Sequence, residues 1–230
     1  MFLGDAYPRQ VVVGRNHDDF PLMYIKGALG QNRTWTQLGD IALIEGHATL
    51  RYIGLFATEN TATAGDAQVN GASNLAIARL TDAGTAMDTT LPDTQSVNSS
   101  GTDRTNRLRW LTAYTDESFE HAVRPKLVPI GNNQYVVLWE HWRSEEVENQ
   151  WGWSEWQGDF YGVYGMVIDE NGDVIAPATL LTEDAHLHRG DDAFTYDGQA
   201  GWMTGDRESR ELHLHLVGAL DQPTLVAHLA

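Results

Sequence analysis

The apolar residues of this chain come in short runs, and this pattern constrains the fold more than any other feature. Nowhere do apolar residues recur at spacings of three and four over three turns, as an amphipathic helix requires. The runs alternate or are continuous, and they are rich in Val, Ile, Leu, Tyr and Trp, which suit a pleated, half-buried surface. We therefore predict an all-β chain. The expected strands are Gln10–Gly14, Pro21–Lys26, Ile41–Ile44, Leu50–Ala57, Asn74–Leu80, Leu108–Tyr114, Lys126–Ile130, Tyr135–Trp142, Tyr161–Asp169, Ala193–Tyr196, Ala200–Met203, Glu211–Val217 and Thr224–Leu229.

Tight turns between the strands indicate a repeated meander. Asp82-Ala83-Gly84, Gly131-Asn132-Asn133, Asn171-Gly172 and Asp197-Gly198 all contain residues that tolerate positive φ. Two units show the order strand, turn, strand, connection, strand, turn, strand: one over 124–177 and one over 192–229. Leu50–Ala57, Leu75–Leu80 and Met87–Leu91 fit a third unit, and Gln10–Gly14, Pro21–Lys26 and Ile41–Ile44 a fourth.

About four units of roughly 40–60 residues match the size of a propeller blade. We expect four four-stranded antiparallel units around a pseudo-axis, with Trp110, Trp139 and Trp202 inside the packing. A two-sheet sandwich is the alternative architecture.

The repeated residues also carry a family resemblance. Arg109-Trp-Leu-Thr112, Arg124-Pro-Lys-Leu, Gly131-Asn-Asn-Gln-Tyr-Val-Val-Leu-Trp-Glu140 and Ile168-Asp-Glu-Asn-Gly172 resemble repeats of bacterial extracellular β-propellers. The resemblance is closest over 124–217. It implies a single propeller-like domain or propeller fragment over 1–230, located outside the cell, in the periplasm or at the cell surface. Propeller blades occur in hydrolases, lectins and scaffolds alike, so the resemblance says little about function.

Net charge and composition limit the classes of partner and of chemical site that the chain can have. The chain has 15 Lys and Arg against 32 Asp and Glu, a net charge of −17, which disfavours nucleic acid and anionic lipid. Cysteine is absent, so disulfides, thiolate metal sites and cysteine nucleophiles are excluded. No apolar stretch approaches the roughly 20 residues of a membrane span. The first residues lack the basic and apolar regions of a signal peptide, so we expect none in this segment.

The segment Glu140–Tyr164 is the most unusual in composition. It holds four of the eight tryptophans and six carboxylates against one arginine, Arg143. We predict that the part between the two expected strands, Trp142–Tyr161, is a long loop that contacts a glycan or other small ligand, because indole faces stack on sugars while polar groups hydrogen-bond the hydroxyls. A cationic ligand, a protein interface and simple packing of the loop against its own blade are the alternatives. The candidate ligand residues are Trp142, Trp151, Trp153, Trp156 and Tyr161, with Glu155 and Asp159 as polar anchors.

Metal-like patterns have simpler explanations. Asp169-Glu-Asn-Gly-Asp173 resembles the start of a calcium loop but lacks the downstream carboxylate, so a hairpin is favoured. The pairs His213/His215 and His186/His188 could each supply half of a metal site, but nothing in the sequence joins them. Arg189-Gly-Asp191 is interpreted as turn chemistry and not as an adhesion motif. We predict no metal site and no cofactor, with calcium as the weak alternative.

Recognised catalytic motifs are absent from the sequence. We therefore predict a non-catalytic binding or interaction module that takes a glycan or protein ligand and assembles with another chain or further domains. One alternative is a propeller-type glycoside hydrolase with paired carboxylates. The other is a structural subunit, which would expose an apolar flank of about 400 Å² on its first or last blade.

Overall fold

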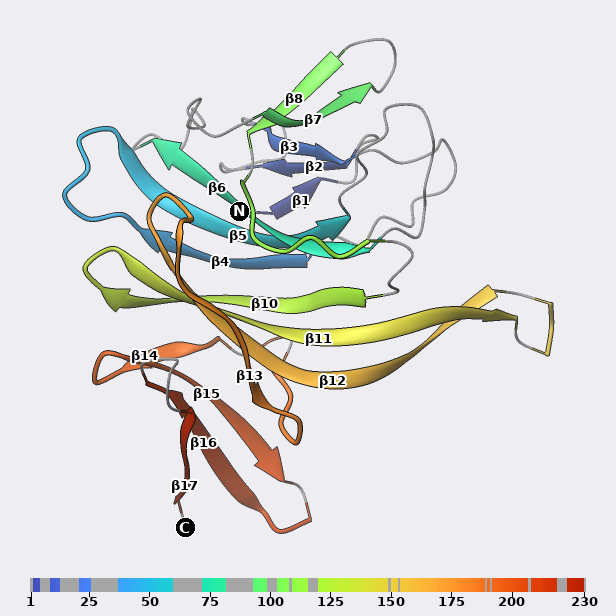
Figure 1. Cartoon of the computed structure of the whole chain (residues 1–230), viewed down its shortest axis with the longest axis vertical. Coiled ribbons are helices and arrows are strands. Elements are labelled where there is room, and N and C mark those ends of the chain that lie inside the picture. The colour runs from blue at the N-terminus through green and yellow to red at the C-terminus, as the bar shows by residue number, and fades with distance from the viewer. Residues whose placement is uncertain are drawn as a thin grey trace.

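The computed structural model in Figure 1 contains only β-strands as regular elements within the residues that it describes. These residues are 2–4, 9–12, 21–25, 37–59, 72–81, 93–98, 103–107, 109–115, 120–148, 150–152, 154–188, 190, 192–206, 208–218 and 223–229. All of the strand pairs among them are antiparallel. The all-β prediction is confirmed.

The strand bounds are as follows: β1 Phe2–Gly4, β2 Arg9–Val12, β3 Pro21–Ile25, β4 Gln37–Leu43, β5 Leu50–Glu59, β6 Ser73–Thr81, β7 Asp93–Asn98, β8 Asp103–Arg107, β9 Arg109–Trp110, β10 Glu120–Gly131, β11 Gln134–Glu148, β12 Ser154–Asp169, β13 Val174–Thr182, β14 Phe194–Tyr196, β15 Gln199–Asp206, β16 Glu211–Val217 and β17 Pro223–Leu229.

The two downstream repeats form the predicted meanders. One sheet has the order β10-β11-β12-β13 and another the order β14-β15-β16-β17. Tight turns set these orders: Asn132 and Asn133 both have positive φ, as do Asp197 and Gly198, the geometry of two-residue hairpins. β13 continues to Thr182, beyond residue 177, where the unit was expected to end.

The upstream units are arranged differently from the prediction. Ile41–Ile44 was assigned to the same unit as Gln10–Gly14 and Pro21–Lys26, but β4 pairs with β5, and the sheet order is β4-β5-β6-β9. The short connection from Ile44 to Leu50 favours this local hairpin, which Ile44 N closes by donating to Arg51 O at 2.7 Å. β1-β2-β3 form a three-stranded sheet and β7-β8 a two-stranded one. Met87–Leu91 and the Asp82-Ala83-Gly84 turn lie outside the described residues.

The expected strand Leu108–Tyr114 is also shorter than predicted. Only Arg109–Trp110 pairs with β6, because the buried Asn74 side chain forms hydrogen bonds with the backbone that follows. Asn74 Oδ1 accepts from Tyr114 N at 2.6 Å, and Asn74 Nδ2 donates to Tyr114 O at 2.9 Å. These bonds replace the sheet ladder and satisfy the same polar groups.

The core lies on both faces of the β10–β13 sheet. Alternate residues of β11 belong to two apolar clusters: Tyr135, Val137 and Trp139 pack toward β4–β6, and Val136 and Leu138 toward β14–β16. Figure 1 shows the three four-stranded sheets as successive layers. Burial of both faces explains the continuous apolar run of β11, since an alternating pattern suits only one buried face. The predicted packing is confirmed for Trp139 and Trp202, which are buried, while Trp110 is half-buried.

Candidate ligand site at the base of the β11–β12 hairpin

The segment that was predicted to be a long loop is a two-stranded arm. β11 and β12 stay paired out to Glu148 and Ser154, whereas β10 begins opposite Arg143 and β13 reaches only Val163. Within the described residues, the arm beyond Arg143 and Asp159 therefore has no other sheet neighbour, and Figure 1 shows it projecting from the stacked sheets. The loop prediction was wrong because Trp, Tyr and Val favour a strand even where polar residues separate them.

A bulge in β12 marks the base of the arm. His141 pairs with Gly162 and Trp142 with Phe160, so Tyr161 is left unpaired between them. Gly162 has φ +134°, and a Cβ at this position would lie 2.6 Å from the Thr182 carbonyl oxygen and would overlap the Leu180 side chain. Only glycine fits, and the irregular strand turns the Tyr161 ring outward, where 44% of the residue is exposed.

A second bulge lies in β10 at nearly the same level. The register shifts between Val123 and Lys126, and Arg124 has φ +54°, an unusual conformation for a non-glycine residue. Arg124 N donates to Gln37 Oε1 at 2.5 Å, which ties the bulge to β4. The conformation directs the Arg124 guanidinium toward the neighbouring strand β11.

A buried carboxylate connects these features. Glu140 is fully buried, and its Oε1 accepts from Arg124 Nη1 at 2.7 Å and from Leu187 N at 2.8 Å. Its Oε2 accepts from Trp142 Nε1 at 2.7 Å, and the His186 ring nitrogen Nδ1 lies 3.3 Å from Oε1. A buried charge persists only when it is paired and hydrogen-bonded, and Glu140 meets both conditions. The carboxylate thereby fastens the β13–β14 connection to the sheet.

On the β4–β6 side of the arm base lies a cavity of about 300 Å³, lined by Glu120, His141, Arg143 and Tyr161. We call it the arm-base cavity. Glu120 and Arg143 are cross-strand neighbours, and His141 Nε2 lies 3.1 Å from Glu120 Oε1. The His141 ring stacks on Tyr114 with centroids 5.0 Å apart and meets the Tyr164 ring edge-on at 5.1 Å.

Burial lowers the pKa of His141 below its usual value, and the nearby Glu120 carboxylate only partly opposes this shift. The imidazole is therefore neutral near pH 7, packed as an aromatic ring in the cavity wall. A phenol ring, a carboxylate and a guanidinium remain to face a ligand. This set can stack on an apolar face and both accept and donate hydrogen bonds.

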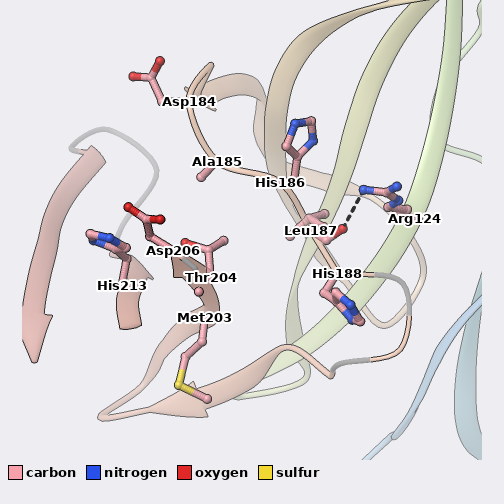
Figure 2. Close-up of a pocket in the computed structure, with 11 residues that line it drawn as sticks. Arg124, Asp184, Ala185, His186, Leu187, His188, Met203, Thr204, Asp206 and His213 are labelled. Atoms are coloured by element: carbon pink, nitrogen blue, oxygen red, sulfur yellow. Dashed lines mark hydrogen bonds between the residues drawn. The ribbon is translucent and has the colours of Figure 1, made fainter. Parts of the chain in front are cut away.

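On the opposite side lies a larger cleft of about 560 Å³ between the β13–β14 connection and the β15–β16 strands. Figure 2 shows Asp206 and His213 on the β15–β16 side of this inter-sheet cleft, and Arg124, His186 and His188 on the other side. Asp184 belongs to the same connection as His186. The histidine pair His186 and His188 therefore faces His213, a member of the other predicted pair, across the cleft. His215 instead stacks on Trp202 with centroids 4.7 Å apart and contacts Thr204 Oγ1 through Nε2 at 2.8 Å. Within the described part of the chain, no group of three or more His, Cys, Asp or Glu residues has an arrangement that could hold a metal ion.

The arm spreads the predicted ligand residues apart. Trp142 is half-buried against Phe160 and His186, and Trp151 lies at the arm tip with 75% of the residue exposed. Tyr161 lines the arm-base cavity, and the exposed Asp159 lies opposite Arg143 in the ladder. In the ladder, Glu155 pairs with Val147 and Trp156 with Glu146. The side chains of Glu155 and Trp156 lie outside the described part of the chain, as does all of Trp153.

Sequence reasoning missed Glu120, His141 and Arg143 in the cavity wall, and Arg124 and Glu140 beneath it. One signal was available: Glu140-His141 interrupts an otherwise apolar strand directly after Trp139. A charged residue at a position that continues a buried strand indicates a paired, buried group. The partner Arg124 has no such signal, because the β10 bulge that orients it is set by tertiary contacts.

The Asp169–Asp173 segment forms the predicted hairpin between β12 and β13. Asp169 Oδ1 accepts from Asn171 N and from Asp173 N, both at 2.8 Å. The Asp173 carboxylate pairs with Arg109 at 2.5 Å, and Arg109 also donates to Asn171 O at 3.1 Å. These carboxylates hold the turn and join it to β9. Arg189 and Asp191 lie outside the described residues.

No helix in the described part of the chain has the length and apolar character needed to cross a membrane. Comparison with protein-family models, with curated proteins and with solved structures found no match to this chain.

Proposed function

We propose that this chain is a non-catalytic binding module of β-propeller type that recognises a glycan at the arm-base cavity. Three four-stranded antiparallel sheets packed face to face support the propeller-type architecture, since each has the up-and-down order of a blade. We take the three-stranded β1–β3 sheet as the fourth unit. The resemblance of 124–217 to extracellular propeller repeats supports a location outside the cytoplasm.

The lining of the arm-base cavity is the observation that carries the proposal. The outward-turned Tyr161 ring offers an apolar face, and Glu120 and Arg143 offer an acceptor and donors beside it. Glycan hydroxyls need both kinds of partner, and the apolar face of a sugar ring needs the aromatic. At about 300 Å³ the cavity is at the small end of ligand sites, so it suits a single sugar unit of a longer chain.

The arm sets the length of ligand that could use more than one aromatic residue. From Ser154 to Tyr161 the strand advances about 3.3 Å per residue, roughly 23 Å in all. Trp151 lies beyond Ser154, so a ligand that contacts both Trp151 and Tyr161 must be an oligosaccharide of several units. A monosaccharide would meet the arm-base cavity alone.

The test is a glycan array on the purified chain, followed by calorimetric titration of the hits. Tyr161→Ala and Glu120→Gln should each weaken binding, Tyr161→Ala by about thirtyfold, which corresponds to the roughly 2 kcal/mol of an anchoring ring. Val174→Ala is the control, because Val174 is 54% exposed on β13 and lines neither cavity. Hits that bind Tyr161→Ala as tightly as the unaltered chain would refute the site.

Triple replacement of Trp151, Trp153 and Trp156 by alanine tests the rest of the arm. If a hit contacts the arm, its affinity falls while the melting temperature stays near that of the unaltered chain. If the rings only pack the arm, the melting temperature falls and the affinity is kept.

A glycoside hydrolase is the second candidate, because Asp184 and Asp206 both line the inter-sheet cleft. Hydrolysis needs one carboxyl group that stays protonated near neutral pH. Hydrogen bonds from the Glu208 backbone, and then from Ser209, lower the pKa of Asp206, so this residue stays ionised and suits only the base. The absence of turnover on a panel of aryl glycosides would favour the binding module, and turnover abolished by Asp184→Asn would favour the hydrolase.

A further inference from the structure

The last sheet has one covered face and one open face. Ala200 and Trp202 of β15 pack on the β10–β13 sheet, and Thr195 Oγ1 donates to Pro129 O at 2.6 Å on the same side. Side chains alternate along a strand, so the intervening residues point to the opposite face. A Cβ on Gly201 would meet both the Leu216 side chain and the Phe194 ring, which places these two residues on that face as well. The open face consists of Phe194, Tyr196, Met203, Leu212, Leu214 and Leu216.

This open face is apolar and largely exposed. Tyr196 is 59% exposed, Leu212 56% and Met203 49%, and the other three residues are half-buried. The other large sheets are covered on both sides: Leu75 and Ile77 of β6 are buried in the core shared with β10–β13, and Ala76 and Ala78 on the opposite face are fully buried too. An open sheet face of the same composition as the buried ones indicates an interface.

We propose that this open face is the contact surface of a symmetric dimer of the chain. The six side chains leave roughly 400 Å² of apolar surface exposed per copy, within the range of a functional patch. Two such patches with their polar rims reach the lower end of a standard interface, about 1,200 Å² in total. Sheets pack face to face at about 10 Å, so two copies can meet as the sheets within one chain do.

A second copy is favoured over an unrelated partner, because closed two-fold dimers are the commonest oligomers of soluble proteins and every other copy presents an identical apolar face. Leu212 projects beside Gly205, and a Cβ on Gly205 would meet only the Leu212 side chain, at 3.7 Å. The Leu212 side chain therefore already covers part of the space above Gly205, and 56% of the residue remains exposed. A two-fold axis through the face places the apolar side chains of one copy, Leu212 among them, against the same face of the other, which is how an isologous interface is built.

Charge predicts how the dimer responds to salt. Each copy has a net charge of −17, and the exposed Asp197 lies in the turn at one end of the open face. Two such copies repel one another at low ionic strength, and salt screens the repulsion. The dimer should therefore tighten as sodium chloride rises.

Sedimentation equilibrium of the full chain at low and high salt tests the proposal. We expect a dimer that tightens with salt, and Leu212→Glu should raise its dissociation constant about a hundredfold or more, since symmetry buries two unpaired charges. Met203→Lys is a second variant on the same face. Ile175→Glu is the matched control, because Ile175 is 51% exposed on β13 and its substitution should leave the dimer intact. Circular dichroism checks that each variant is folded.

The lack of cysteine makes the geometry directly testable. Leu212→Cys carries the only thiol of the chain, so a short bifunctional maleimide should link two copies across the facing sheets, whereas Ile175→Cys should stay unlinked. A monomer at all salt concentrations, or a dimer that Leu212→Glu and Met203→Lys leave unchanged, would overturn the proposal. So would oligomers that grow without limit with concentration, since those need a head-to-tail contact. None of these outcomes bears on the glycan site, which lies on another sheet.

Discussion

Replacing Glu140 by glutamine is the sharpest test of how the arm base is built. In Glu140→Gln, the amide oxygen can keep the bonds from Arg124 Nη1 and Leu187 N, but it accepts them without a charge. The amide NH₂ then faces Trp142 Nε1–H, which is a donor against a donor. The loss of charge assistance costs about 1–1.5 kcal/mol, discounted because the Arg124 side chain is 35% exposed, and an unsatisfied buried donor costs about 1–3 kcal/mol. We expect a total loss of about 2–4.5 kcal/mol in the free energy of unfolding.

Trp142→Phe separates the two contributions. Alone, it leaves Glu140 Oε2 without its indole donor and should cost about 1–2 kcal/mol. In the double variant no N–H faces the glutamine amide, so its cost should fall short of the sum of the single costs by about 1 kcal/mol or more.

Urea unfolding followed by tryptophan fluorescence and by circular dichroism gives these free energies, provided that the two probes coincide. Glu45→Gln is the control, because the Glu45 side chain is exposed and its two bonds to Asn133 use only backbone atoms. A Glu140→Gln variant within about 0.5 kcal/mol of the unaltered chain, or an additive double variant, would refute the proposed network.

Three further predictions concern pH and backbone geometry. Burial lowers the pKa of His141 and His215 below 6.5, so the unfolded chain binds protons that the folded chain does not, and stability should fall as pH drops below about 6.5. Urea midpoints near pH 5 and pH 8 should show this fall, and His215→Gln should reduce it. Burial raises the pKa of Tyr135 to about 12, so stability should be lost as pH rises above about 10, where the unfolded phenol ionises. Tyr135→Phe should reduce this loss without removing it, because burial also raises the pKa of Tyr114. Gly162→Ala should cost about 2 kcal/mol or more because its Cβ has no room, whereas Gly46→Ala, with open space around it, should cost about 1 kcal/mol by the same urea assay.

The parts of the fold that local chemistry decides could be predicted from the sequence. Asn132-Asn133 and Asp197-Gly198 form turns with positive φ whatever surrounds them, so the two downstream meanders followed from the turns. The assignment of Ile41–Ile44 failed because a short apolar run does not say which neighbour it pairs with. The arm failed for a related reason: mixed aromatic and polar residues were interpreted as a loop, although a hairpin needs only partners for its backbone groups.

The candidate site was predicted only in part, for a geometric reason. Tyr161 was identified by its residue type. Glu120 and Arg143 are 23 positions apart in the sequence and become neighbours only through the register of β10 against β11. The bulge that releases Tyr161 depends on Gly162 and on the close approach of Thr182. Such contacts follow from packing between strands, which residue types along one chain do not encode.

The two cavities share one stretch of β11, and this constrains how any variant there must be interpreted. Glu140 and His141 are adjacent, so their side chains point to opposite faces: Glu140 holds the His186–Leu187 segment of the inter-sheet cleft, and His141 lines the arm-base cavity. The bulges at Arg124 and Tyr161 flank these two residues on the neighbouring strands. A change at Glu140 therefore displaces the wall of one cavity and the backbone of the other. Only residues such as Tyr161 and Asp184, which line one cavity each and take no part in the Glu140 network, can assign a binding effect to a single cavity.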